Sequence, residues 1–348
     1  MSAPIGFVPA ALPRNLKAAL RDIDSRKVQV RRSAARDLGT HVDSSARAQV
    51  VARLSAVAEQ DPDTEVRAQA ILALADGGAT EVVAVLVQLA NTAAPRVMQM
   101  ALLALSELAQ PGEPEACAAA HRALSSELPG LRYQGLVALR HISEKVAAPT
   151  IATALVDPDD EVRWVAVRLL DELFQQMESE GEAREWALPL IPRLRAVLHD
   201  RNLRVAAASQ LLLARWGDAE AIHDLPALLS ANGSSLERQD ELDAIRLVAR
   251  FRVEAAKPAL QKRAWPLFFD TPVAFEARVA LAHLGDNRAE QSILRDLHSP
   301  VASRCARAIE PVGLLRLVDG RARLMQLLDN PALFDGEAVR QALQRLDG

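Results

Sequence analysis

The sequence has little cysteine and no long apolar run, and each shortage excludes a class of protein. Only two cysteines, Cys117 and Cys305, occur in 348 residues, which excludes a disulfide-rich scaffold and a cysteine-rich zinc module. The longest apolar runs, such as Val82–Val87, are far shorter than the roughly 18 residues that a membrane span needs. Residues 1–13 lack a basic segment and contain three prolines, so they do not resemble a signal peptide. We therefore expect a soluble protein of the cytoplasm, without membrane insertion.

Residue patterns typical of catalysis or ligand binding are also missing. The seven histidines never fall three or four positions apart, which is the spacing that helical metal ligands need. The fifteen glycines include no phosphate-binding loop and no esterase-type nucleophile motif. The net charge of −4 does not suit a protein that coats nucleic acid. We predict no catalytic residue, no cofactor and no bound metal.

Aromatic residues are scarce: one Tyr, seven Phe and four Trp. Sheets favour aromatic and β-branched residues, whereas an excess of Ala and Leu is typical of closely packed helices. The composition therefore predicts an all-α fold. Arginine greatly exceeds lysine, which is typical of a GC-rich genome and suggests a bacterial source.

One pattern recurs along the chain: an acidic turn, then Val-Arg, then Ala and Leu at helical spacing. It is clearest at residues 61–74 and 157–170, where aspartate precedes proline. Asp61 and Asp157 are predicted to cap helix starts, because aspartate accepts hydrogen bonds from free backbone N–H groups. One helix pair cannot bury such an apolar stripe alone, so neighbouring pairs must stack. The copies begin at Val30, Val66, Val97, Leu131 and Val162, with spacings of 36, 31, 34 and 31 residues.

This repeat predicts about ten antiparallel helix pairs in one domain spanning 14–348, preceded by a loose N-terminal arm of residues 1–13. The two clearest runs resemble HEAT repeats, in the subgroup first noticed in phycobilisome lyases. The resemblance covers residues 25–217 well and decays beyond them. It implies a right-handed α-solenoid in which aspartates and arginines of successive repeats form a ladder. Its members by resemblance would be Asp61, Arg67, Asp157 and Arg163, with each arginine pairing with helix-start carboxylates between adjacent repeats.

Charge is unevenly distributed at the beginning of the chain. Residues 1–60 carry ten basic and five acidic residues, whereas residues 61–120 carry two basic and eight acidic ones. The cations Arg31, Arg32 and Arg36 are candidates for docking an acidic partner. A solvated charged face would produce the same pattern, so both interpretations stay open.

The second candidate surface is a proline-bounded aromatic turn that contains Trp265, Phe268 and Phe269. Exposed Trp and Phe contribute strongly to binding, and two adjacent Phe side chains cannot both enter one core. The alternative interpretation is that these aromatic side chains do not bind a partner but cover the core where the repeat is irregular. Trp164, in an inner-helix segment, is a further candidate.

We interpret the chain as a non-enzymatic scaffold or adaptor that binds another protein along its solenoid surface. One alternative is an enzyme or chaperone that resembles the bilin lyases and holds an open-chain tetrapyrrole. A lesser alternative is a HEAT-like DNA glycosylase, although the net charge opposes a basic DNA-binding groove.

Overall fold

A computed structural model of the chain describes residues 13–143, 147–176, 185–230, 236–267, 270–329 and 334–347. The described residues form helices and no strand, as the composition predicts. Contacts between residues divide the chain into two compact units, 1–178 and 179–348. Residues 1–12 of the expected N-terminal arm lie outside the described part, and the expectation of one solenoid domain stays a prediction.

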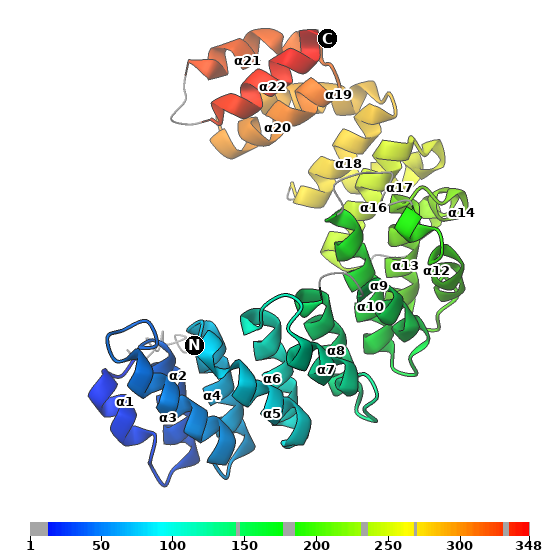
Figure 1. Ribbon diagram of the computed structural model, residues 1–348. Helices are drawn as coiled ribbons and strands as arrows, with labels where there is room; N and C mark the ends of the chain where they lie inside the picture. The colour runs from blue at the N-terminus through cyan, green and yellow to red at the C-terminus, as the bar shows by residue number, and fades with distance from the viewer. Residues whose placement is uncertain are drawn as a thin grey trace, which may run out of the picture. The chain divides into compact units, whose positions relative to one another are not determined.

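In its described residues, the first unit forms five antiparallel helix pairs, which follow one another along the chain (Figure 1). The second helix of each pair contacts the second helix of the next, so that α2, α4, α6, α8 and α10 form one layer. The elements are α1 (Leu16–Asp22), α2 (Val28–Gly39), α3 (Arg47–Gln60), α4 (Thr64–Asp76), η1 (Thr80–Val82), α5 (Val83–Thr92), α6 (Pro95–Leu108), α7 (Pro114–Ala123), α8 (Pro129–Ile142), α9 (Ala147–Thr153), η2 (Ala154–Val156) and α10 (Asp160–Gln175).

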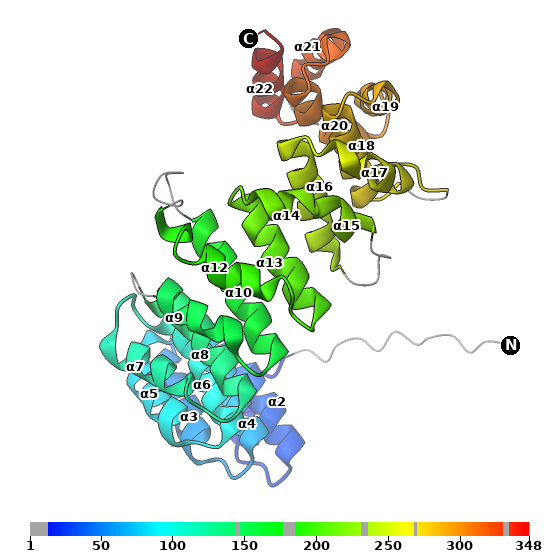
Figure 2. The same ribbon diagram turned by 90° about the vertical axis from the view of Figure 1, so that its right-hand side faces the viewer.

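The described residues of the second unit also form five pairs, so the total of ten in the described parts of the chain agrees with the predicted number. In this unit α16 contacts both α13 and α18, and α20 contacts α22 (Figure 2). The elements are α12 (Ile191–Val197), α13 (Leu203–Arg215), α14 (Ala219–His223), α15 (Leu225–Ser230), α16 (Arg238–Phe251), η3 (Glu254–Ala256), α17 (Lys257–Ala264), α18 (Pro272–His283), α19 (Asn287–Leu297), α20 (Ala302–Leu314), η4 (Val318–Gly320), α21 (Arg321–Leu328) and α22 (Gly336–Asp347).

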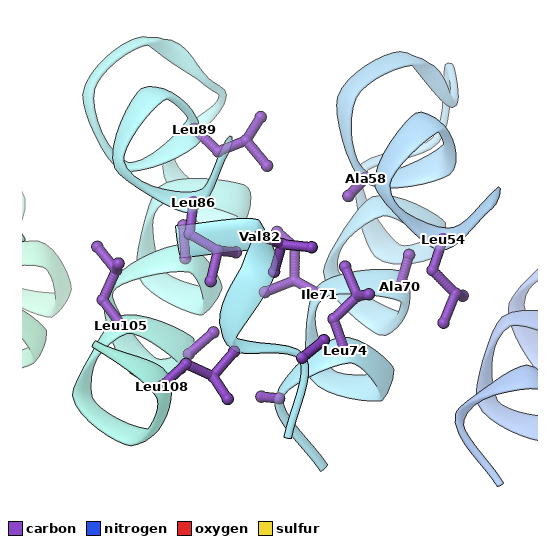
Figure 3. Packing of buried hydrophobic residues seen from close by; sticks show 14 of the residues in the cluster. Leu54, Ala58, Ala70, Ile71, Leu74, Val82, Leu86, Leu89, Leu105 and Leu108 are labelled. Atoms are coloured by element: carbon purple, nitrogen blue, oxygen red, sulfur yellow. The ribbon is translucent and has the colours of Figure 1, made fainter. Parts of the chain in front are cut away.

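The recurring apolar stripe is the core of the first unit. Each repeat valine or leucine is the third residue of its helix, from Val30 in α2 to Val162 in α10. The residues four and eight positions later face the neighbouring helices: in α4, for example, Ala70 and Leu74 are both fully buried. Side chains from α3, α4, η1, α5 and α6 meet in this core (Figure 3). Stacking of the pairs therefore removes each stripe from water.

The helix caps differ from the sequence prediction by two residues. Asp63 caps α4, accepting hydrogen bonds from the backbone N–H groups of Glu65 and Val66 at 3.0 and 3.1 Å. Asp159 caps α10 in the same way. Asp61 and Asp157 do not cap these helices and instead accept from the N–H groups two residues later, at 2.9 Å. The prediction of caps at Asp61 and Asp157 was wrong, because the helices begin only at the residues after Asp63 and Asp159.

Gly135 of α8 is expected to be intolerant even of alanine. It occupies the position four after Leu131, and a Cβ there would lie 2.9 Å from the backbone oxygen of Ala120 in α7. We expect Gly135→Ala to lower the free energy of unfolding by about 1–3 kcal/mol through overpacking, although alanine is the better helix former. Urea unfolding followed by circular dichroism measures this change.

Gly130 on the same helix provides the matched control. A Cβ at Gly130 would meet only the flexible side-chain amide of Gln99. Gly130→Ala should therefore be neutral or stabilising by up to about 1 kcal/mol. Equal effects of the two substitutions would contradict the close approach of α7 and α8.

Candidate functional site

Two arginine–aspartate pairs link neighbouring helix pairs in the first unit. Arg31 donates from Nε and Nη2 to the two carboxylate oxygens of Asp61, at 2.7 and 2.9 Å. Arg132 binds Asp157 in the same bidentate way, with both distances at 2.7 Å. The two aspartate side chains are only 6% and 9% exposed. We call these pairs the rungs; such bidentate, charge-assisted bonds fix the geometry of the residues that they join.

Each rung arginine also holds the turn before its own helix. Arg31 Nη1 donates to the carbonyl oxygen of Ser25, and Arg132 Nη1 donates to that of Ser126, both at 3.0 Å. Arg31, which the sequence suggested for partner binding, is therefore engaged within the chain, and its side chain is 12% exposed. The sequence indicates this structural role of Arg31 only when the arginine is matched with Asp61, the aspartate that precedes the next second helix.

Arg67 and Arg163, the two arginines predicted for the ladder, donate to backbone carbonyl oxygens. Arg67 Nε donates to Ala58 at 2.7 Å, and Arg163 Nη1 donates to Asp157 and Pro158 at 2.8 and 3.2 Å. The described residues contain no Arg67–Asp61 ion pair, because the Asp61 carboxylate already binds Arg31. In the next repeat, the position equivalent to Asp61 is Thr92, which has no charge to offer Arg67.

The rung also shifts the acidity of its carboxylate. Burial raises the pKa of Asp61, but the hydrogen bonds from Arg31 and from the Asp63 backbone N–H, together with the charges of Arg31 and Arg67, lower it by more. The pKa of Asp61 therefore lies below its ordinary value. Asp61 is held as an anion in the folded protein, which couples the stability of the first unit to pH.

The cations on the outward side of α2 are more accessible than Arg31. Arg32 is 43% exposed and lies 3.8 Å from Glu65 of α4. Glu65 is shared, since Arg96 of α6 approaches it at 3.2 Å. Arg36 is exposed and forms no ion pair among the residues that the structure describes.

The aromatic candidates stack with arginines. Trp164 is half-buried in α10, with the Arg168 guanidinium carbon 6.0 Å from its ring centroid. Trp265 follows α17, is half-buried, and has Arg288 stacked over it at 4.0 Å. Phe268 and Phe269 lie outside the described residues. Leu267, directly before them, is 93% exposed.

A partly buried ion cluster beside the aromatic turn was not predicted from the sequence. Arg278 is bidentate to Asp270 at 2.9 and 3.0 Å, and its side chain is 6% exposed. Arg307 of α20 contacts Asp270 and also binds Asp296 of α19 at 2.7 Å. The available signal was Arg278 itself, three residues after the buried Phe275 and hence on the same side of α18. This cluster ties three elements together and neutralises its own charges.

The described residues offer neither a metal site nor a membrane span. No group of three or more His, Cys, Asp and Glu side chains in that part of the chain is arranged to hold a metal ion. None of the described helices is both long and apolar enough to span a bilayer.

Comparison with known proteins identifies the repeat. Residues 13–106 match the family model described as HEAT repeats, and no curated protein sequence matches the chain. Among solved structures, YibA of Escherichia coli has a TM-score of 0.56 at 18% identity, covering 79% of this chain and 93% of that one. Kap121p bound to Nup53p and Kap121p bound to Ste12p give 0.54 and 0.55 at 15% and 16% identity. Both alignments cover 95% of this chain but only 40% of Kap121p, so these likenesses concern the fold.

Removing a rung arginine should destabilise the protein more than removing a surface arginine. The Asp157 side chain is only 9% exposed, and Arg132→Met removes the cation that binds it. We expect the unpaired carboxylate to cost about 2–3 kcal/mol of unfolding free energy. Arg21→Met, at a side chain that is 76% exposed, should cost less than about 1 kcal/mol. Urea unfolding of both variants provides the comparison. Adding Asp157→Asn to Arg132→Met should recover part of the loss; no recovery would contradict an unpaired carboxylate as its cause.

Acid should weaken the Asp61 rung. Because the folded pKa of Asp61 is lowered, its stabilising contribution is present above the ordinary carboxylate pKa and is lost as pH falls through the folded value. In Arg31→Met, burial raises the pKa of Asp61 without an opposing hydrogen bond from this arginine. We expect the parent to lose unfolding free energy more steeply than Arg31→Met below about pH 4. Parallel pH profiles in urea unfolding would refute this coupling.

Proposed function

We propose that this chain, whose residues 13–106 match HEAT repeats and whose fold resembles that of YibA, is a non-enzymatic scaffold that binds another protein along its layer of second helices. The proposed partner presents acidic groups to the arginines of α2. Extended surfaces built from stacked helix pairs are the common binding device of solenoid proteins. The two solved Kap121p structures, each bound to another protein, provide support by analogy of fold.

The observation that carries this proposal is a row of equivalent residues across the layer. Six positions after each repeat valine or leucine, the helices α2 to α10 place side chains that are half-buried or exposed. We call this set the +6 row. Its members are Arg36, Leu72, Leu103, Val137 and Arg168.

The composition of the +6 row fits a protein ligand. Arginines stand at both ends, while the middle three helices offer Leu72, Leu103 and Val137, all half-buried. The row lies on the opposite side of each helix from the buried stripe, since six residues correspond to a rotation of about 240°. Apolar contacts in the middle with charges at the rim are typical of protein interfaces.

Two of the residues predicted from the sequence occupy equivalent positions beside the +6 row. Arg32 and Trp164 are each two positions after their repeat valine, on α2 and α10 respectively. This proposal therefore uses Arg32, Arg36 and Trp164, whereas Arg31 contributes by fixing the turn before α2. The rim arginines are expected to govern association rate and salt sensitivity.

Charge reversal on α2 should weaken partner binding. The partner is first isolated by affinity capture from native lysate and identified by mass spectrometry. We expect Arg32→Glu with Arg36→Glu to weaken its binding about tenfold or more, mainly through a slower association rate, because both cations become anions. Biolayer interferometry at two salt concentrations measures the rates.

The matched control is Arg295→Glu with Arg304→Glu, which changes the net charge equally at two exposed positions of the second unit. It should bind the partner like the parent. If the α2 variant keeps the parent melting temperature, affinity and salt dependence, the proposed docking along α2 is wrong.

A further inference from the structure

The second unit contains a hollow that the proposed function does not use. It has a volume of about 530 Å³ and lies among the start of α16, the end of α17 and the start of α18. These helices lie side by side in the second unit (Figure 2). We call it the turn pocket, defined by Leu236, Arg238, Glu241, Lys262, Arg263 and Val273. Its volume is within the range of protein sites that hold one or two side chains or a small ligand.

The turn pocket has an uncompensated positive charge. Its one acidic lining residue, Glu241, accepts a hydrogen bond from Arg263 Nε at 2.6 Å, so these two charges cancel. Arg238 and Lys262 are exposed and have no carboxylate partner among the residues that the structure describes. The lining therefore presents two cations whose charges are not neutralised within the pocket.

Two arginines near the turn pocket are paired with glutamates. Arg204 binds Glu237 at 2.8 Å, and Arg246 binds Glu276 at the same distance. Glu237 directly precedes Arg238, yet it is bound by an arginine of another helix. Arg238 and Lys262, in contrast, have no such partner in the described part of the chain and line the same hollow, so both are available to a ligand there.

Apart from Thr271, the remaining walls of the turn pocket are apolar. Pro266 and Pro272 line the turn pocket and have no backbone N–H, and Leu236 and Val273 add apolar surface. Leu267, next to Pro266, is 93% exposed. An exposed leucine beside an apolar wall favours a ligand that covers it with an apolar side chain.

We propose that the turn pocket binds an acidic peptide segment of a partner protein. A carboxylate of the peptide lies between Arg238 and Lys262, and an adjoining apolar side chain packs on Val273 and Leu267. This site deepens the proposed scaffold function and rests on it. Nucleic acid fits less well, because residues 179–348 carry 23 basic and 23 acidic residues and so offer no net charge to a phosphate backbone.

The probe is a fluorescein-labelled hexapeptide of alternating acidic residues and leucine, titrated into the full chain by fluorescence anisotropy. We expect saturable binding that weakens at least tenfold in Arg238→Glu with Lys262→Glu. A peptide with Asn and Gln in place of its acidic residues should bind at least tenfold more weakly to the parent. Arg295→Glu with Arg304→Glu again serves as the charge-matched control and should bind like the parent.

Circular dichroism and thermal melting establish that the variants are folded, and Arg238→Gln with Lys262→Gln is the milder pair. Unchanged peptide affinity in both folded pocket variants would overturn the proposal, as would a labelled DNA oligonucleotide that displaces the peptide. The Arg32→Glu, Arg36→Glu variant should retain the peptide. If the Arg32→Glu, Arg36→Glu variant loses the captured partner and the parent does not bind the peptide, the turn-pocket proposal is wrong while the proposed scaffold function stands.

Discussion

The fold depends on one constraint: a helix pair in this chain cannot bury its own apolar stripe. Ala70 and Leu74 of α4 are fully buried only because α3 lies on one side and neighbouring second helices lie on the others. The small residue at the first of these positions sets how closely the helices approach, and at Gly135 even a methyl group would collide with a backbone oxygen. Each helix pair therefore depends on the adjacent pairs for its stability, and this need to stack produces the layer of second helices.

The rungs act within this stacked arrangement. Stacking brings Arg31 to Asp61 and Arg132 to Asp157, and burial then makes each carboxylate dependent on its arginine. Such a pair adds little net stability over an apolar alternative, but breaking it leaves a buried charge. The rungs thus fix the register of adjacent pairs, while the hydrophobic stripe supplies the free energy of association.

The second unit solves the same problem with different residues. Its α18 lacks the Val-Arg pair, and Arg278 and Arg307 converge on Asp270 instead. Packing of Phe275 beneath these arginines explains why part of the aromatic segment belongs to the fold. The surfaces left for ligands are consequently different: an apolar row with arginine ends in the first unit and a cationic, proline-walled hollow in the second.

The sequence by itself determined the all-α class, the number of helix pairs and the buried face of each second helix. These follow from local periodicity, which places Val66, Ala70 and Leu74 on one side of a helix wherever it packs. Only the tertiary structure decided which charges meet, because a partner such as Asp61 is thirty residues from Arg31 and is chosen by the stacking of neighbouring pairs. The same reason separates Arg31, occupied in a rung, from Arg36, which stays exposed on the same helix.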